Sequence, residues 1–354
     1  METLEIVRRR LARQHLSTPP LASPADVVGF LGAVQAQEYP EAKWSLSQRS
    51  GDPPDSEVEA AIERGEILRT HIMRPTWHFV LPADIVWMQR LTAPRVQAGN
   101  RSRYRDLELD EATRARGAEV MLEALEPGEP LTRTELGDAL ERSSITARGE
   151  RLAHIVMYAE LEALICNGPR RGKQHTYLTL SPRASKRRDL EGDEARAELA
   201  RRFFTSHGPA RIKDFNWWSG LKVGDCRAGL ASIRDELESF RDGDGEDWYA
   251  ADFGGVPPGG TLMLGMYDEV GVGYRDPRIV YAAERPEGFT LQRQVQIDGV
   301  CVGSWKRTLE REAVEVEVTL IRALNNDEEA GLRREVDRFG HFIALKPRLR
   351  VVGP

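Results

Sequence analysis

Two absences in the sequence exclude whole classes of protein. The 354 residues contain no apolar stretch that approaches the roughly 20 residues needed by a membrane-spanning helix. Residues 1–10 include three consecutive arginines and no apolar stretch followed by small residues, so no secretory signal is recognisable. We therefore expect a cytoplasmic protein without membrane association, and the 40% hydrophobic and 30% charged residues fit a globular chain.

Cysteine and the familiar catalytic motifs are also scarce. The three cysteines, Cys166, Cys226 and Cys301, are far apart and fit neither a disulfide framework nor a zinc-binding spacing. The sequence has no Gly-x-Ser-x-Gly, no glycine-rich phosphate loop and no His-Glu-x-x-His. We predict a protein that uses neither a metal ion nor a cofactor.

The charge is negative overall but unevenly distributed. A net charge of −6 by itself argues against a nucleic-acid partner, because such proteins usually carry an excess of lysine and arginine. Residues 165–188, however, contain seven basic residues and no acid, whereas acids concentrate in residues 189–198 and 242–247. Segregation of this kind is what a protein that binds DNA with one face requires.

The length and the order of the patterns predict several domains. One pattern occurs three times: helices, then two short β-prone runs joined by a polar turn, which is the outline of a winged helix-turn-helix. We predict an α+β fold of tandem winged helix-turn-helix units with a small, β-barrel-like C-terminal domain. The predicted boundaries are 1–127 for the first winged-helix region, 128–190 for the second, which has a basic hairpin, 191–255 for the third, and 256–354 for the β domain.

Local signals give the expected elements of the first two regions. Ser23 caps a helix that begins at Pro24, after an N-terminal helix and before a third helix over 56–64. Runs 67–72 and 76–80 predict the first hairpin. Thr132 and Glu135 have the spacing of a capping box, and a later long helix is expected to stop at residues 167–169, before a basic turn and a strand over 175–180.

The remaining elements follow the same logic. The third region should contain helices at about 195–206 and 223–237 on either side of the segment 211–220, with a hairpin at 247–253. Beyond Pro257 and Pro258 the texture changes to strands, expected over 261–266, 278–282, 292–297, 301–306 and 313–320, with a closing helix over 327–339. Asp298-Gly299 predicts a tight hairpin turn.

The best candidates for chemistry are two glutamines at the end of an apolar helix stripe. Gln35 and Gln37 cannot share one face of a regular helix, but Pro40 disfavours helix at Tyr39 and should unwind this end, so that both amides could enter one cavity. Alternatively, the pair merely caps the helix and bonds to solvent. The spacing alone favours this second interpretation.

Resemblance to a known family changes that balance. The stretch Leu31-Gly32-Ala33-Val34-Gln35-Ala36-Gln37 resembles the catalytic motif of the AlkZ and YcaQ family of winged-helix DNA glycosylases. Further stretches resemble the family in the same order along nearly the whole chain, namely 68–78, 214–220, 267–269, 273–276 and 298–305. Together these matches are specific for the superfamily and less so for the substrate.

The resemblance implies an activity and a catalytic pair. Gln35 and Gln37 match the Gln-x-Gln of the AlkZ-like branch, whereas the YcaQ-like branch, which unhooks cross-links broadly, has Gln-x-Asp. The implied reaction is monofunctional hydrolysis of the N-glycosidic bond of cationic N7- or N3-alkylated purines, including bulky natural-product adducts or cross-links, in base excision repair or self-resistance. Lacking a carboxylate base, the enzyme should leave unmodified bases uncut. The partner is double-stranded DNA with alkylated bases, no protein partner is implied, and we expect a monomer.

Several other residues are candidates for contacting DNA. The resemblance places the second hairpin against DNA, which makes Arg170, Arg171, Lys173 and Gln174 the predicted contacts; an ordinary solvated turn is the alternative. On the first hairpin the candidates are Thr76 and His78, although a hairpin histidine, like His71, is more often structural. If the basic turn is ordinary surface, the DNA path should run over Arg101, Arg103 and Arg105.

Two further features have competing interpretations. The adjacent Trp217 and Trp218 suggest base stacking, but we expect at least one to lie in the core. Residues 267–269 and 273–275 are expected to shape the β domain and to hold it against the helices. The rival to a glycosylase is a non-catalytic winged-helix DNA-binding protein or transcription regulator. Against it stand both glutamines and the lack of a dimerisation helix.

Overall fold

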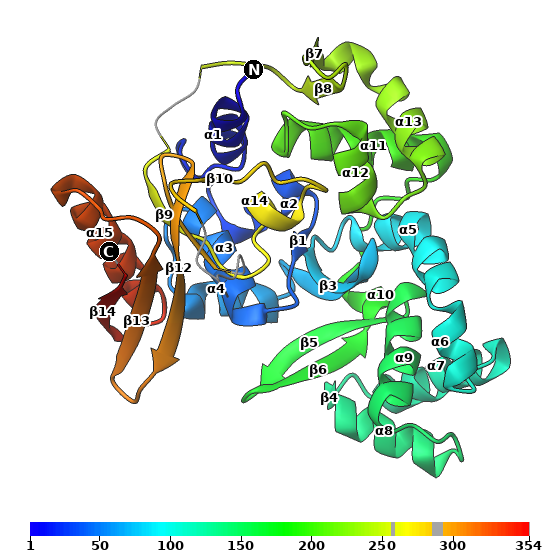
Figure 1. The fold of residues 1–354 in the computed structure, drawn as a ribbon. Coiled ribbons are helices and arrows are strands. Elements are labelled where there is room, and N and C mark those ends of the chain that lie inside the picture. Colours follow the sequence, from blue (N-terminus) through cyan, green and yellow to red (C-terminus); the bar gives the residue numbers. More distant parts are fainter. Residues whose placement is uncertain (256–258, 285–292, 354) are drawn as a thin grey trace. The chain divides into compact units, whose positions relative to one another are not determined.

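The computed structural model describes residues 1–255, 259–284 and 293–353 (Figure 1). Contacts between residues divide the chain into two compact units. The first comprises Met1–Ala60, Ala200–Trp218 and Ile233–Pro354, and the second comprises Ala61–Leu199 and Ser219–Ser232. Pro257, Pro258 and the start of the strand expected at 292 lie outside the described residues. Within the described part, no helix is long and apolar enough to cross a membrane.

The N-terminal elements begin much as expected. Helix α1 (Thr3–Arg13) is followed by α2 (Pro24–Leu31), whose first turn is capped by the Ser23 side chain, which accepts from the Asp26 N–H at 3.1 Å. Gly32 ends α2 with a φ of 86°, a left-handed conformation that favours glycine. The two-residue strand β1 (Val34–Gln35), α3 (Tyr39–Arg49) and α4 (Asp55–Glu63) follow.

Helix α3 was not predicted, and the expectation that Pro40 would unwind this stretch is wrong. Pro40 lies in the first turn of α3, where a missing N–H costs no hydrogen bond. The helix is buried on nearly all sides, so it shows no apolar stripe in the sequence. Its buried charges are instead neutralised by ion pairs, Glu41 with Arg293, Lys43 with Asp55 and Arg49 with Asp268.

The first unit contains a six-stranded sheet that curls into a half-barrel, which agrees with the expected barrel-like β domain. The strands β9 (Thr261–Met263), β11 (Gln294–Ile297), β12 (Val300–Leu309), β13 (Ala313–Leu320) and β14 (Lys346–Val352) run in the order β14-β13-β12-β11-β9, and β10 (Val280–Tyr281) pairs with β12. The predicted turn at Asp298-Gly299 is confirmed, because both residues have positive φ and join β11 to β12. Strand β14 was not predicted.

Helix α3 is anchored to this sheet by tryptophans. The Trp44 indole N–H donates to the Met263 carbonyl at 2.8 Å, and Trp305 on β12 donates to the Leu264 carbonyl at the same distance. Both rings contact Phe339 of α15 (Asn326–Phe342), with centroid distances of 5.3 and 5.1 Å. The sheet, α15 and α3 therefore share one core, and this core holds the chain that follows the glutamine motif.

The second unit begins with the predicted first hairpin, strands β2 (Leu68–Ile72) and β3 (Arg74–Val80). Three helices that the sequence did not reveal come next: α5 (Ile85–Gly99), α6 (Arg101–Asp106) and α7 (Glu111–Leu125). Helices α8 (Arg133–Arg142) and α9 (Gly149–Leu161) share a core with α7 and with the hairpin β5 (Ile165–Arg171) and β6 (Gln174–Thr179). Strand β4 (Leu131–Thr132) pairs with β6, and α10 (Leu180–Arg183) follows it.

Two predictions in this unit have different outcomes. The capping box of Thr132 and Glu135 is present at the start of α8. The long helix, however, ends at Leu161 rather than at residues 167–169, which lie inside β5. Gly168 serves close strand pairing and not helix termination, because a Cβ there would lie 2.8 Å from the Thr176 hydroxyl oxygen on β6.

The third predicted group of elements is present with shifted ends. Helices α11 (Gly192–Ser206), α12 (Ile212–Ser219) and α13 (Val223–Ser232) are followed by the 3-10 turn η1 (Arg234–Glu236) and the hairpin β7 (Glu238–Arg241) and β8 (Asp247–Ala250). The short helix α14 (Glu269–Val272) lies beyond β9. The four-part domain division and the tandem winged-helix arrangement stay predictions.

Candidate functional site

The two glutamines of the motif lie in different environments. The sequence predicts that both lie at a frayed helix end, which is wrong. Gln35 lies on β1, and Gln37 lies in the bend between α2 and α3. Gln35 is 8% exposed and Gln37 is exposed. The structure therefore buries one amide of the pair and leaves the other accessible, instead of enclosing both in one cavity.

The Gln35 side chain is notable for what it does not contact. Its amide oxygen is buried without a hydrogen-bond partner within the described residues. The amide oxygens of Gln48, Gln89 and Gln296 are also unpaired, but each of these side chains is held through its amide nitrogen. Gln35 is instead held by its backbone, which leaves the amide available to a ligand.

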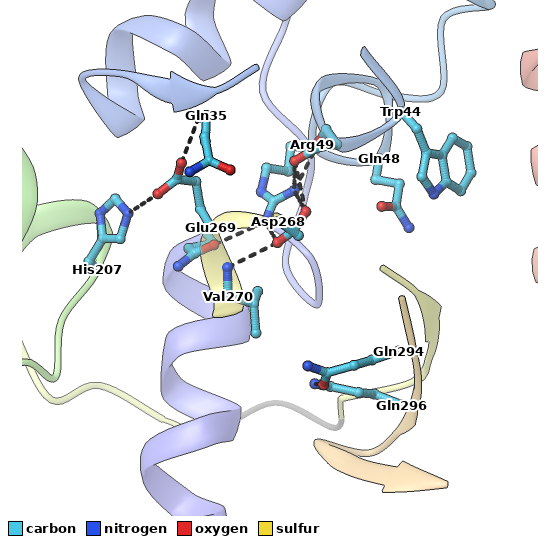
Figure 2. A network of polar contacts seen from close by, with 12 residues as sticks. Gln35, Trp44, Gln48, Arg49, His207, Asp268, Glu269, Val270, Gln294 and Gln296 are labelled. Carbon is cyan, nitrogen blue, oxygen red and sulfur yellow. Dashed lines mark hydrogen bonds and ion pairs between the residues drawn. The ribbon is translucent and has the colours of Figure 1, made fainter. Parts of the chain in front are cut away.

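The backbone of Gln35 is bound by a buried carboxylate from α14 (Figure 2). The Gln35 N–H donates to Oε1 of Glu269 at 2.8 Å. The other oxygen of Glu269 accepts from the Trp218 indole N–H at 3.1 Å and lies 3.3 Å from Nε2 of His207. Glu269, His207 and Trp218 have no exposed surface, so this acid cannot touch DNA directly.

A second buried acid lies next to the first. Asp268 caps α14 and forms a two-pronged ion pair with Arg49 of α3, with N–O distances of 2.8 and 2.9 Å (Figure 2). Burial opposes the charge, but the Arg49 guanidinium outweighs it and lowers the pKa of the Asp268 carboxyl. The two consecutive acids thus connect α14 to β1 through Glu269 and to α3 through Asp268.

The His207 ring is enclosed by aromatic side chains. It stacks on Phe203 with a centroid distance of 4.9 Å, contacts Trp218 at 5.3 Å, and places Nδ1 2.7 Å from the Ser206 hydroxyl oxygen. Burial lowers the pKa of the imidazole, and the neighbouring Glu269 opposes this shift. The imidazole therefore forms part of the buried scaffold behind Gln35.

Metal-ligand clusters and reactive thiols are other possible sources of chemistry in a protein. No group of three or more histidine, cysteine, aspartate or glutamate side chains in the described part of the chain could hold a metal ion. All three cysteines are buried, and burial raises the pKa of Cys166 to about 12 and of Cys301 to about 11. Neither thiol is a ready nucleophile. At the motif, the Gln35 amide oxygen is buried and has no hydrogen-bond partner within the described residues.

The basic hairpin has the predicted shape but not all of its cations project freely. Gly172 and Lys173 form its two-residue tip, between Arg171 and Gln174, and these four residues are exposed. Arg171, however, is held by Glu135 at 2.7 Å and by the Pro130 carbonyl at 2.6 Å. Lys173 and Gln174 are the hairpin-tip side chains best placed to meet a ligand.

The first hairpin contributes little surface at the predicted positions. His78 has no exposed surface, and its Nδ1 lies 3.0 Å from the Thr76 carbonyl oxygen; its contact with DNA stays a prediction. Thr76 is half-buried, with its hydroxyl unpaired within the described residues. His71 is buried beside Glu160 and against the Trp77 ring, as expected for a core histidine.

The remaining candidates also separate. Trp218 is fully buried, as predicted for at least one of the two tryptophans, whereas Trp217 is 48% exposed and donates its indole N–H to the Val272 carbonyl. Arg103 is paired with Glu150. Arg101 and Arg105 line a cavity of about 950 Å³ that also contains four acidic residues, Glu108, Asp110, Glu111 and Glu162, which would repel a phosphate.

Comparison with known proteins identifies the class to which this fold and site belong. The family model described as DNA glycosylase AlkZ-like matches residues 28–342, so the chain belongs to this family of DNA glycosylases. An interstrand DNA cross-link repair glycosylase from Streptomyces sahachiroi is 26% identical over 325 residues, covering 84% of this chain and 85% of the relative. The solved structure of the Streptomyces sahachiroi DNA glycosylase AlkZ has the same fold, with a TM-score of 0.80, 21% identity, and coverage of 99% and 100% of the two chains.

The sequence did not reveal Glu269, Asp268, Arg49 or His207 as part of the site. For residues 267–269 the sequence predicts only that they shape the β domain and hold it against the helices. Asp268 and Glu269 lie more than 230 positions from Gln35 in the sequence, and the Gln35–Glu269 bond spans 234 residues. No local pattern reports a contact of that length.

Proposed function

We propose that this glycosylase hydrolyses the N-glycosidic bond of cationic N7- or N3-alkylated purines in double-stranded DNA, with Gln35 and Gln37 as the catalytic amides. The observation that carries the proposal is the Gln35 amide oxygen, which is buried and has no hydrogen-bond partner within the described residues. Most buried polar groups are bonded, and a catalytic role is one explanation for a group that is not.

The chemistry explains why neutral amides suffice. A purine alkylated at N7 or N3 carries a positive charge, so the bond to the sugar breaks readily through an oxocarbenium-like transition state. The enzyme then has to place a water molecule and favour developing charge. The Gln35 amide oxygen can accept a hydrogen bond from that water, and the exposed Gln37 is free to contact the deoxyribose or a phosphate.

The substrate range is proposed from the relative and from the motif. The curated relative is named for repair of interstrand cross-links, so bulky N7 adducts and cross-links are candidate substrates beside simple methylated purines. The protein would serve base excision repair or self-resistance. In this proposal Lys173 and Gln174, at the tip of the β5–β6 hairpin, contact the DNA backbone.

The test is base release from defined duplexes under single-turnover conditions. Duplexes with N7-methylguanine, a bulky N7-guanine adduct or an interstrand cross-link should yield abasic sites. A duplex with uracil should not, because this neutral base is a poor leaving group without stronger acid–base catalysis. Release of uracil at a comparable rate, or release of none of the three cationic lesions, would contradict the proposal.

Variants of the motif separate catalysis from folding. Gln35→Ala and Gln37→Ala should each lower the rate about 10²- to 10³-fold while DNA affinity stays within a few-fold, because a transition-state contact is removed. Gln48→Ala is the matched control: this buried glutamine of α3 donates to the Met263 carbonyl at 3.3 Å and should keep the wild-type rate. Full activity in both motif variants would reduce the pair to a structural feature.

A further inference from the structure

Glu269 is an expensive residue to bury. Transfer of a carboxylate out of water is strongly unfavourable unless hydrogen bonds or charges compensate it. Here the compensation includes an indole N–H from α12, an imidazole beyond α11 and the main-chain N–H of Gln35. One of the contacts that stabilise this carboxylate is therefore the backbone of the motif itself.

We propose that Glu269 is the positioning residue for Gln35: its carboxylate fixes the Gln35 main chain, and thereby presents the Gln35 amide to the reacting water and sugar. The inference rests on the proposed function of Gln35. Glu269 itself touches neither DNA nor substrate, because it has no exposed surface.

The local backbone explains why such an anchor is needed. Gln35 belongs to a strand of only two residues, between the left-handed Gly32 and a bend at Gln37 and Glu38. The Glu269 carboxylate gives the main chain of this short strand a fixed acceptor at the Gln35 N–H. A displacement of about 1 Å at a reacting group can cost on the order of 10² in rate.

The carboxylate is itself held in a single orientation. Trp218 and His207 both bind Oε2, and Oε1 accepts from the Gln35 N–H. Figure 2 shows the contacts of Glu269 with His207 and Gln35. The preceding Asp268 caps α14 and is locked by Arg49 on α3. The first turn of α14 thus binds two elements of the motif region: α3 through Asp268 and β1 through Glu269.

The two possible roles of Glu269, purely structural anchor and positioning residue, predict different effects of its substitution. A structural anchor would change stability and leave the rate of each folded molecule unaltered. A residue that acts through Gln35 should change the single-turnover rate, and the change should disappear once the Gln35 side chain has been removed.

The experiment compares two variants of similar size in the full-length protein. Glu269→Met fills the space but accepts no hydrogen bond, and we expect the saturated single-turnover rate on N7-methylguanine duplex to fall about 10²-fold with DNA affinity nearly unchanged. Glu269→Gln keeps an acceptor for the Gln35 N–H and should recover at least about tenfold of that loss. In the Gln35→Ala background, Glu269→Met should lower the rate less than about threefold further.

The matched control is another buried acid of the same unit. Glu335 on α15 is 8% exposed and paired with Arg338 at 3.2 Å, so Glu335→Gln should affect stability while leaving the rate unchanged. Wild-type rates in a folded Glu269→Met variant, or fully additive losses with Gln35→Ala, would overturn the proposal. Should Glu269→Met fail to fold, a loss of more than about 10²-fold in a well-folded Glu269→Gln variant would overturn it as well.

A readout independent of catalysis separates this inference from the proposed function. Hydrogen exchange of the Gln35 main-chain N–H should accelerate in Glu269→Met but not in Glu335→Gln, because only Glu269→Met removes the acceptor of that N–H. If the wild-type protein releases no cationic base, the proposed function fails, yet faster exchange would still support the anchor. Unchanged exchange in Glu269→Met would overturn the anchor even in an active enzyme.

Discussion

Replacing Asp268 by asparagine should destabilise the first unit strongly. The side chains of Arg49 and Asp268 are only 1% and 3% exposed, so neither charge can return to water when its partner is lost. In Asp268→Asn the Arg49 guanidinium keeps three neutral acceptors, the Ser45 carbonyl, the Ser45 hydroxyl and the Gln14 amide oxygen. It loses its counter-charge, and one-sided removal of a buried pair costs about 3–5 kcal/mol.

The same reasoning predicts that a second substitution repairs part of the damage. Arg49→Met removes the uncompensated charge, so the double variant Arg49→Met/Asp268→Asn should be about 2 kcal/mol or more stabler than Asp268→Asn alone. Urea unfolding followed by circular dichroism gives the free energies. Hydrogen exchange within α3 locates the change, which matters because two compact units need not unfold in one step.

The exposed pair of Arg241 and Asp247 provides the control. It has the same two-pronged geometry, with N–O distances of 2.8 and 3.0 Å, but both side chains are largely in solvent. Asp247→Asn should leave stability essentially unchanged, since exposed pairs contribute little. Equal effects of the two asparagine substitutions, or a double variant no stabler than Asp268→Asn, would refute the argument that burial sets the cost.

Three further predictions concern metal, DNA binding and pH. Excision should persist in EDTA because the proposed catalytic groups are amides; activity lost in chelator and restored by a divalent metal would contradict this. Changing Arg170, Arg171 and Lys173 together to alanine should weaken binding to damaged and undamaged duplex alike and lower the salt slope by about one unit per lost phosphate contact, mostly through Lys173, because Arg171 is already paired. Unchanged affinity across a salt titration would move the DNA path elsewhere. The pKa of His207 is lowered in the folded protein, so its contribution to stability is present above about pH 6.5 and is lost as the pH falls below that value. Melting curves at pH 8 and 5.5 should therefore differ less for His207→Gln than for the wild-type protein, and identical pH dependence would argue against it.

Local signals in the sequence predicted the elements whose causes are local. Ser23 and Pro24 start α2, Thr132 and Glu135 form the capping box of α8, and Asp298-Gly299 makes the β11–β12 turn. Each depends on hydrogen bonds or backbone preferences within a few residues. The sequence also indicated Gln35 and Gln37 as the candidate catalytic pair, through a resemblance to the family whose model matches this chain.

Tertiary contacts decided what local patterns could not express. Helix α3 has no apolar stripe because its buried face includes Glu41, Lys43 and Arg49, and each is neutralised by a residue distant in the sequence or on another element. Gly168 resembled a helix stop, but its role is close approach to β6.

The sequence by itself determined that this protein carries a Gln-x-Gln motif of the AlkZ-like family and where many of its helices and hairpins begin. Only the tertiary structure decided that Gln35 is buried and Gln37 is exposed. It also decided that Glu269 on α14 binds the Gln35 main-chain N–H. The physical reason is that a buried carboxylate needs partners from several elements at once, and the sequence separation of those partners, here up to 234 residues, leaves no periodic or short-range trace.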